Sequence, residues 1–288
     1  MIRSGPLTPI TRVSDLRGAL DACRQDGLSV GFVPTMGYLH EGHASLIREA
    51  DRHDDFVGVS IFVNPLQFAP TEDLAAYPRD LDRDTELAQK AGCDLLFVPD
   101  ASEMYPEPVL TTVTVDEVST GLEGSSRPSH FAGVATVVAK LFNIVGPCRA
   151  YFGEKDFQQL AVIRRMVRDL SFPIEVVGCP TVRELDGLAM SSRNAYLTPA
   201  ERAAAPVVHR ALQAGVACIG AGERDPGVVH ELVAAIIEAE PLAKLDYVAV
   251  VESDSLTPVP APLVGNLRLL AAVGFGRARL IDNVGVTV

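Results

Sequence analysis

The sequence predicts an α/β protein with a doubly wound parallel sheet and a second, smaller α+β domain. Three observations lead to this fold class. Up to about residue 183, short apolar runs alternate with longer segments of helical period. After that point two Ala- and Val-rich helical segments precede three strand-like runs. The chain has 288 residues, enough for two domains of roughly 100 to 200 residues each. We therefore expect domains at 1–183 and 184–288.

The first domain contains five apolar runs that are predicted to be buried parallel strands, each closed by Pro, Gly or Asn. These runs are 29–33, 56–63, 94–98, 150–153 and 174–177. The predicted helices between them are 14–25, 42–52, 80–91, 131–145 and 157–170. Strands that alternate with helices favour a Rossmann-like sheet with helices on both faces. In such sheets, ligands bind beyond the carboxyl ends of the strands.

The second domain is predicted from its helix-start signals. Thr198-Pro199 and Asp225-Pro226 each place an N-cap before a Pro at the first helical position. They predict one long helix up to about residue 219 and another up to about residue 240. The strand-like runs are 247–251, 267–273 and 277–281, and the Pro-rich stretch 257–262 is predicted to be a loop.

The composition excludes several partners. The 25 Lys and Arg against 37 Asp and Glu give a net charge of −12, which repels nucleic acid and anionic lipid. No apolar run approaches the roughly 20 residues of a membrane span, and residues 1–17 lack a signal-peptide core. The five cysteines are dispersed, which predicts buried small hydrophobes rather than a disulfide framework or a zinc site. We expect a cytoplasmic protein without nucleic-acid or membrane partners.

The most informative segment, P-T-M-G-Y-L-H-E-G-H, follows the first predicted strand. His40 and His43 lie three residues apart at a predicted helix start, where free backbone N–H groups attract anions and imidazoles can donate to a polyphosphate. Gly42 leaves room for a base or a ribose. Taken alone, the segment also fits a capping turn with two surface histidines. A zinc-protease motif is disfavoured, because that motif needs His at i and i+4.

Three further segments place polar side chains near strand ends or in loops. Gly153 permits close backbone approach, Lys155 can neutralise a phosphate, and Asp156 can cap a helix or bind a ribose hydroxyl. The hydroxyls and guanidinium of Ser191–Arg193 can surround a triphosphate. The amide of Gln67 suits a small substrate with hydroxyl and carboxylate groups. Taken singly, each segment is also compatible with an ordinary turn.

Together, in this order, these segments resemble the pantoate–β-alanine ligase family. The matched motifs are P-T-M-G-x-L-H-E-G-H, F-V-N-P-x-Q-F, G-E-K-D-x-Q-Q and M-S-S-R-N, within residues 30–197. Residues 77–79, 104–106, 127–134 and 280–283 are also similar. The first motif resembles the His-x-Gly-His signature of the wider nucleotidyltransferase superfamily as well. Tyr38 and Phe157 occupy positions where family members vary.

The resemblance implies an ATP- and Mg²⁺-dependent ligase that joins pantoate to β-alanine through a pantoyl adenylate and releases AMP and diphosphate. It implies His43, His40, Lys155 and Arg193 as catalytic residues, with His43 as the proton donor. The implied ATP site contains Met36, Gly37, Tyr38, Leu39, His40, Glu41, Gly42, His43, Gly153, Glu154, Lys155, Asp156, Val182, Met190, Ser191, Ser192 and Arg193. Gln67 and Gln159 are implied to bind pantoate, and Gln67 also β-alanine. No Mg²⁺ ligand is implied.

A His at a helix N-terminus tends to stay neutral, so we also consider that His43 acts as a hydrogen-bond donor rather than an acid. The resemblance further implies a homodimer, with segment 56–63 or 131–145 as a candidate interface. Loop 69–77 and the C-terminal domain are candidate lids over the reactive adenylate. Two other functions stay open: an adenylyltransferase that retains the nucleotidyl group in its product, and a catalytically silent nucleotide-binding module.

Overall fold

The computed structural model describes residues 6–68, 74 and 77–288. Most of the predicted lid loop 69–77 therefore lies outside the described residues. The chain divides into two compact units. The first extends to Glu154 and includes Val162–Pro180, and the second comprises Lys155–Ala161 and Thr181–Val288. The division after Pro180 is close to the boundary expected after residue 183, but a short segment around Lys155 also belongs to the second unit.

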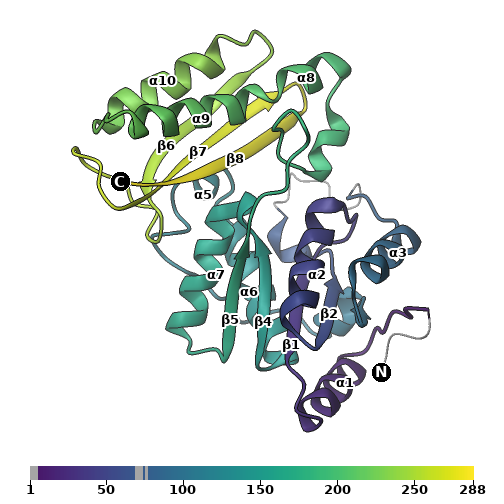
Figure 1. Ribbon diagram of the computed structural model, residues 1–288. Coiled ribbons are helices and arrows are strands. Elements are labelled where there is room, and N and C mark those ends of the chain that lie inside the picture. Colours follow the sequence, from purple (N-terminus) through teal and green to yellow (C-terminus); the bar gives the residue numbers. More distant parts are fainter. Residues whose placement is uncertain (1–5, 69–73, 75–76) are drawn as a thin grey trace. The chain divides into compact units, whose positions relative to one another are not determined.

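The first unit contains a parallel sheet with the strand order β3-β2-β1-β4-β5 (Figure 1). Its strands are β1 Val30–Thr35, β2 Phe56–Ile61, β3 Leu95–Phe97, β4 Cys148–Gly153 and β5 Ile174–Cys179. All five predicted strands are present. The chain adds strands on one side of β1 up to β3 and then on the other side with β4 and β5. Sheets of this kind bind ligands beyond the carboxyl ends of the strands where this reversal occurs.

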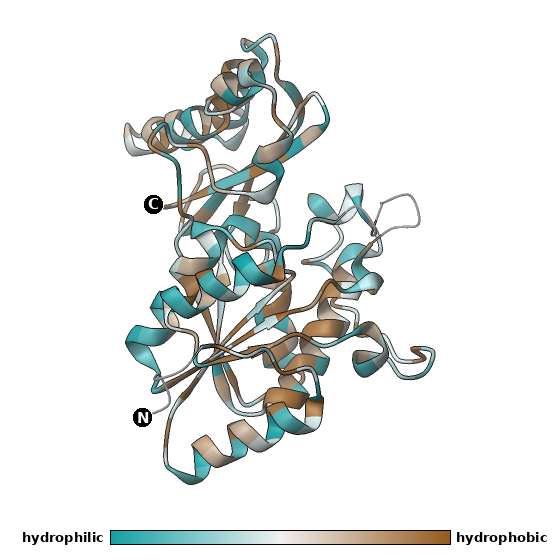
Figure 2. Ribbon diagram, turned by 90° about the vertical axis from the view of Figure 1, so that its right-hand side faces the viewer, coloured by the Kyte–Doolittle hydropathy of each residue, from teal (hydrophilic) through white to brown (hydrophobic). Residues whose placement is uncertain are grey.

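The long helices of the first domain lie close to the segments predicted from helical periodicity. They are α1 Val13–Gln25, α2 Glu41–His53, α3 Leu81–Ala91, α6 His130–Val145 and α7 Phe157–Asp169. The short helices could not be predicted from the sequence, because a single turn is too short to show a helical repeat of apolar residues. These are η1 Pro65–Gln67, α4 Ala101–Met104, α5 Glu123–Ser126 and η2 Glu154–Asp156. Figure 2 shows hydrophobic and hydrophilic residues on most helices, as expected for helices with one buried face.

The strand proposed as a dimer interface cannot serve as one. β2 lies between β1 and β3, and all six of its residues are buried. It therefore has neither a free edge nor an open face. The other candidate, α6, has 12 of its 16 residues buried and offers little open surface.

The second unit has an antiparallel sheet with the order β6-β7-β8 and a core beneath its helices. The elements are η3 Ser192–Tyr196, α8 Pro199–Ala204, α9 Val207–Gly220, α10 Pro226–Glu238, β6 Lys244–Glu252, β7 Asn266–Phe275 and β8 Ala278–Thr287. Thr198 and Asp225 cap α8 and α10 as predicted, each accepting a backbone N–H with its side chain. No helix among the described residues is long and apolar enough to cross a membrane.

Two predictions for the second unit are wrong. The long helix after Thr198 is two helices, because Pro206 has no N–H to donate and its ring opposes continuation of α8. The last strand was expected to end at residue 281 but continues to Thr287. The polar pair Asp282-Asn283 interrupts the apolar run in the sequence, yet both residues are buried inside β8.

Candidate active site

The histidines of the first motif cap the start of α2 reciprocally. The N–H of Gly42 donates to Nδ1 of His40 over 3.1 Å, and the N–H of His40 donates to Nδ1 of His43 over 3.2 Å. The ring centroids are 4.1 Å apart. Because each Nδ1 accepts a hydrogen bond, each neutral ring carries its proton on Nε2. In this tautomer the Nε2–H group of each ring is the one that can donate to a ligand.

The expectation of free backbone N–H groups at the helix start is partly wrong, because the N–H of Gly42 donates to His40 Nδ1 and the N–H of His43 to the carbonyl of His40. The N–H groups of Tyr38 and Leu39 both donate to the carboxylate of Asp84 over 2.7 Å. Gly37 and Tyr38 have φ values of +84° and +50°, which lie in the left-handed region. The loop therefore binds a carboxylate of its own chain through these two N–H groups.

Asp84 is a support of the site that sequence reasoning missed. Its carboxylate is buried, and burial raises its pKa while the two backbone hydrogen bonds oppose that rise. A Cβ at Gly37 would lie 2.9 Å from Ile61 and 3.2 Å from Asp84, so only glycine fits there. Leu39 is fully buried in the core and supports the segment from beneath.

Gln67 lies in η1 with its amide held in one orientation. Its Nε2 donates to Sδ of Met36 over 2.7 Å, and its Oε1 accepts from Nδ2 of Asn64 over 3.2 Å. Asn64 also donates to the carbonyl of Gly133 and accepts from the hydroxyl of Tyr105. Burial raises the pKa of Tyr105 to about 12, which keeps this hydroxyl protonated as a donor. The structure thus brings the predicted residues Met36 and Gln67 together.

The segment 127–134 forms the support behind Gln67. A Cβ at Gly133 would lie 2.3 Å from the carbonyl oxygen of Leu66, so the backbone of α6 rests directly on η1. The Nδ1 of His130 is 3.1 Å from the carbonyl oxygen of Gln67, and Nη1 of Arg127 is 3.3 Å from the other ring nitrogen of His130. The contacts of this segment with Leu66 and Gln67 give a structural reason for its similarity to the family.

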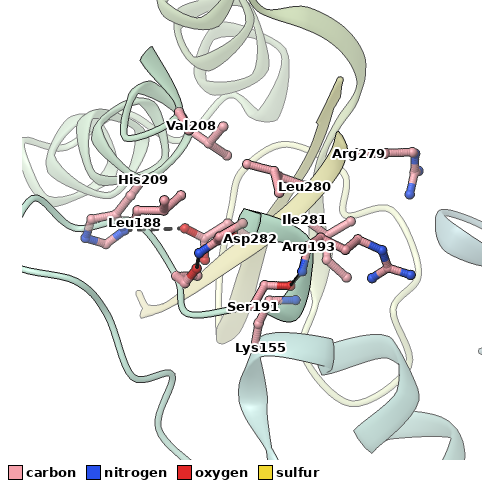
Figure 3. A pocket seen from close by; sticks show the side chains of 13 residues that line it. Lys155, Leu188, Ser191, Arg193, Val208, His209, Arg279, Leu280, Ile281 and Asp282 are labelled. Carbon is pink, nitrogen blue, oxygen red and sulfur yellow. Dashed lines mark hydrogen bonds and ion pairs between the residues drawn. The ribbon is translucent and has the colours of Figure 1, made fainter. Parts of the chain in front are cut away.

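Lys155, Ser191 and Arg193 of the second unit line one pocket, together with Arg279 and Asp282 (Figure 3). The Nζ of Lys155 is 3.6 Å from the carboxylate of Asp156. The hydroxyl of Ser191 accepts the N–H of Arg193 over 3.2 Å and caps η3. The pocket therefore gathers three cationic side chains, of which Arg279 was not predicted. A pocket of this composition suits a phosphate-bearing ligand.

Val182, Met190, Gln159 and Gly153 were also predicted from the sequence. Val182 and Met190 are joined by a backbone hydrogen bond of 2.9 Å at the base of the turn that precedes Ser191. Gln159 lies in α7 and is half-buried. Gly153 ends β4, and a Cβ there would have nothing within 4 Å.

Gly153→Ala tests whether a ligand approaches the end of β4. The open space predicts an unchanged thermal midpoint of unfolding, whereas a nucleotide resting on this backbone would meet the added methyl group. The ATP site implied by the resemblance predicts that the KM for ATP rises about tenfold with little change in the KM for pantoate. Steady-state kinetics and a thermal melt check this, and an unchanged KM for ATP would remove Gly153 from the nucleotide site.

His209 makes the second unit sensitive to acid. Its buried Nδ1 has no hydrogen-bond partner among the described residues and lies 3.8 Å from the carboxylate of Asp282. Burial and the charge of Arg183 lower the pKa of His209 below its ordinary 6.5, against the opposing effect of Asp282. The unfolded chain therefore binds the proton more readily. Stability is fully present above about pH 6.5 and falls as the pH drops toward the lowered pKa.

His209→Gln is expected to flatten the dependence of the thermal midpoint on pH below about pH 6.5. His230→Gln is the matched control, since His230 is exposed on α10. Thermal melts at several pH values measure both variants. A profile for His209→Gln that stays parallel to the unmodified protein would contradict the assignment.

A doubly wound parallel sheet with a turn of polar groups after its first strand is typical of the nucleotide-binding class of α/β enzymes. Among the described residues, no group of three or more His, Cys, Asp or Glu side chains is placed to hold a metal ion. The chain belongs to the pantoate–β-alanine ligase family, whose model matches residues 8–285. The predicted fold class and the family resemblance are confirmed.

Individual relatives match over nearly their whole length. The chain is 55% identical to the pantothenate synthetase of Moorella thermoacetica over 276 residues, covering 96% of this chain and 97% of the relative. It is similar to a crystal structure of pantothenate synthetase from Thermus thermophilus, with a TM-score of 0.92, 51% identity, and coverage of 98% and 100%. A pantoate–β-alanine ligase structure from Francisella tularensis, complexed with β-γ ATP and β-alanine, gives a TM-score of 0.77, 32% identity, and coverage of 96% and 97%.

Proposed function

We propose that this protein condenses (R)-pantoate with β-alanine to pantothenate, using ATP through a pantoyl adenylate and releasing AMP and diphosphate. The observation that carries this proposal is the family match over residues 8–285. The Francisella tularensis relative, whose structure contains an ATP compound and β-alanine, supports the same substrates. The polar side chains of all four motifs are present in this chain.

In the first step, a carboxylate oxygen of pantoate attacks the α-phosphorus of ATP, and the bond to diphosphate breaks. Neither the nucleophile nor the leaving group requires a proton, so positioning and charge stabilisation provide most of the catalysis. We assign the Nε2–H groups of His40 and His43 and the cations of Lys155 and Arg193 to this task. Each is a donor that can strengthen its hydrogen bonds as charge moves onto the phosphates.

In the second step, the amine of β-alanine attacks the carbonyl carbon of the mixed anhydride, the bond to AMP breaks, and the proton lost by the nitrogen passes to solvent. We assign pantoate binding to Gln67 and Gln159, and β-alanine binding to Gln67. The fixed amide of Gln67, held by Met36 and Asn64, supports this role because a preorganised donor and acceptor loses little entropy on binding. The other residues of the implied ATP site are proposed to line the nucleotide, with Leu39 acting from beneath.

Mg²⁺ belongs to this proposal as the partner of ATP. Mg²⁺ in nucleotide sites is usually held by substrate phosphates, water and one or two carboxylates. The donors present fit such an ion, because the exposed carboxylate of Asp156 lies beside Lys155 in the phosphate-binding segment. When bound, the ion would neutralise phosphate charge. We further propose a cytoplasmic homodimer whose C-terminal unit limits access of water to the adenylate.

Product analysis separates this function from its alternatives. After incubation with ATP, pantoate and β-alanine, mass spectrometry is expected to find AMP, diphosphate and the amide pantothenate. A product that keeps the nucleotidyl group would support an adenylyltransferase instead. ATP binding without turnover of any of these substrates would support a silent nucleotide-binding module.

A further inference from the structure

Two polar residues, Asp282 and Asn283, lie side by side in the middle of β8, with only 5% and 4% of their surfaces exposed. They belong to the similar segment 280–283, to which the proposed mechanism gives no role. Buried polar groups are retained only where hydrogen bonds compensate their loss of water. Both residues meet this condition, and their partners are the segments that carry Lys155 and Arg193.

The side chain of Asn283 anchors the turn that carries Lys155. Its Nδ2 donates to the carbonyl oxygen of Lys155 over 3.0 Å. Its Oδ1 accepts from Nη1 of Arg268 over 3.0 Å, which fixes the orientation of the amide. The guanidinium of Arg268 lies 3.6 Å from the ring centroid of Phe157, two residues beyond Lys155. The turn is therefore attached to the sheet of the second unit on both sides of Asp156.

Asp282 attaches the same strand to the loop that carries Arg193. Its carboxylate forms a bidentate pair with Arg183, at 2.6 and 2.9 Å, and accepts the N–H of Asn283 over 2.7 Å. Arg183 also donates to the carbonyl of Gly187 over 3.1 Å, which closes the turn before Ser191. One short piece of β8 thus holds both cationic segments of the pocket.

We propose that Asn283 is a positioning residue that acts through Lys155, a role that rests on the proposed function of Lys155. The ammonium of Lys155 is a point charge on a flexible stem, so its placement on a phosphate depends on where its backbone is held. A rigid strand holds that backbone in place, so no reorganisation is needed during the reaction. Displacement by about 1 Å is enough to lower a rate by as much as 10²-fold.

Asn283→Asp tests this role, because it keeps the acceptor for Arg268 but faces the carbonyl of Lys155 with an oxygen in place of the donor. Asn283→Ala removes the donor without adding charge. Asn266→Asp is the matched control, since Asn266 is exposed on β7 and its acceptor for the hydroxyl of Thr287 is kept. Each variant is measured in pantoate-dependent ATP–diphosphate exchange, in the reaction of pantoyl adenylate with β-alanine, and in a thermal melt.

We expect both Asn283 variants to lower kcat/KM for ATP in exchange by at least about tenfold, while the reaction of preformed adenylate changes less than about threefold. The double variant Lys155→Ala/Asn283→Ala should then have the same kcat/KM for ATP as Lys155→Ala alone. Equal losses in both half-reactions, additive losses with Lys155→Ala, or losses matching the fraction of unfolded protein would overturn the inference. Absence of exchange in the unmodified protein would instead reject the proposed function.

Discussion

His43→Ala is expected to lower the rate of pantoate adenylation by about 10²-fold while the protein stays folded. The substitution removes the Nε2–H donor that the structure assigns to His43 through its accepting Nδ1. It also removes the acceptor of the His40 N–H, which costs some stability at the start of α2. Pantoate-dependent exchange of diphosphate into ATP measures the chemical effect, and a thermal melt measures the structural one.

Two conservative variants distinguish a donor from an acid at this position. His43→Gln places an amide N–H near the position of Nε2, whereas His43→Asn keeps an acceptor near Nδ1 and has no group at Nε2. If His43 is a donor, the Gln variant retains part of the adenylation rate and the Asn variant does not. Equal loss in both variants, together with a new dependence on external buffer acids, would favour acid catalysis. Unchanged turnover in both would remove His43 from the mechanism.

Gly133→Ala is expected to lower the free energy of unfolding by about 1–3 kcal/mol, because the added Cβ cannot fit 2.3 Å from the carbonyl of Leu66. Relief of this overlap moves α6 away from η1 and disturbs Asn64, which donates to the carbonyl of Gly133, and with it Gln67, whose Oε1 accepts from Asn64. We expect the KM for pantoate to rise at least about tenfold and the KM for ATP to change less. Chemical denaturation and steady-state kinetics measure the two effects.

Gly18→Ala is the matched control for Gly133→Ala. Gly18 is also helical, but a Cβ there has nothing within 4 Å, so this variant should be neutral or more stable by about 0.5–1 kcal/mol. Gln67→Ala, which removes the amide itself, should weaken pantoate more than ATP. Equal weakening of both ligands by Gly133→Ala would show that α6 stabilises the unit without serving the amide.

The strands, the long helices and the motif positions could be predicted from the sequence, because each depends on residues that are close along the chain. The apolar runs define β1 to β5, and the His-x-Gly-His spacing places two imidazoles at one helix start. The same local reasoning fails at Pro206. The helical spacing of apolar residues continues past this proline, but the proline has no N–H for a helical hydrogen bond and the helix ends before it. The same reasoning also fails at Asp282, whose polarity suggests the end of a strand that in fact continues.

The supports of the site could not be predicted, because their partners are distant in sequence. Asp84 lies on α3, where an acidic residue ordinarily faces water, yet it binds two N–H groups of the loop after β1. Gly133 is one small residue in an apolar helix, and nothing local shows that η1 rests on it. The amide of Asn283 reaches Lys155 across more than a hundred residues of chain. Tertiary packing alone creates these contacts.

The net charge of −12 means that the protein as a whole repels anionic substrates. All substrates of the proposed reaction are acids, so the chain must present cations locally against its own field. In the second unit, Lys155, Arg193 and Arg279 line one pocket, and its carboxylate Asp282 is already paired with Arg183. This pairing leaves the pocket with an excess of positive charge.

Pantoate-dependent exchange of labelled diphosphate into ATP is the most direct measurement of the central claim. The unmodified protein should catalyse this exchange with ATP, Mg²⁺ and pantoate in the absence of β-alanine, because adenylate formation is reversible on the enzyme. Omission of pantoate should abolish the exchange, and later addition of β-alanine should release AMP and pantothenate in equal amounts. Exchange that does not depend on pantoate, or no exchange at all, would contradict an adenylate-forming ligase.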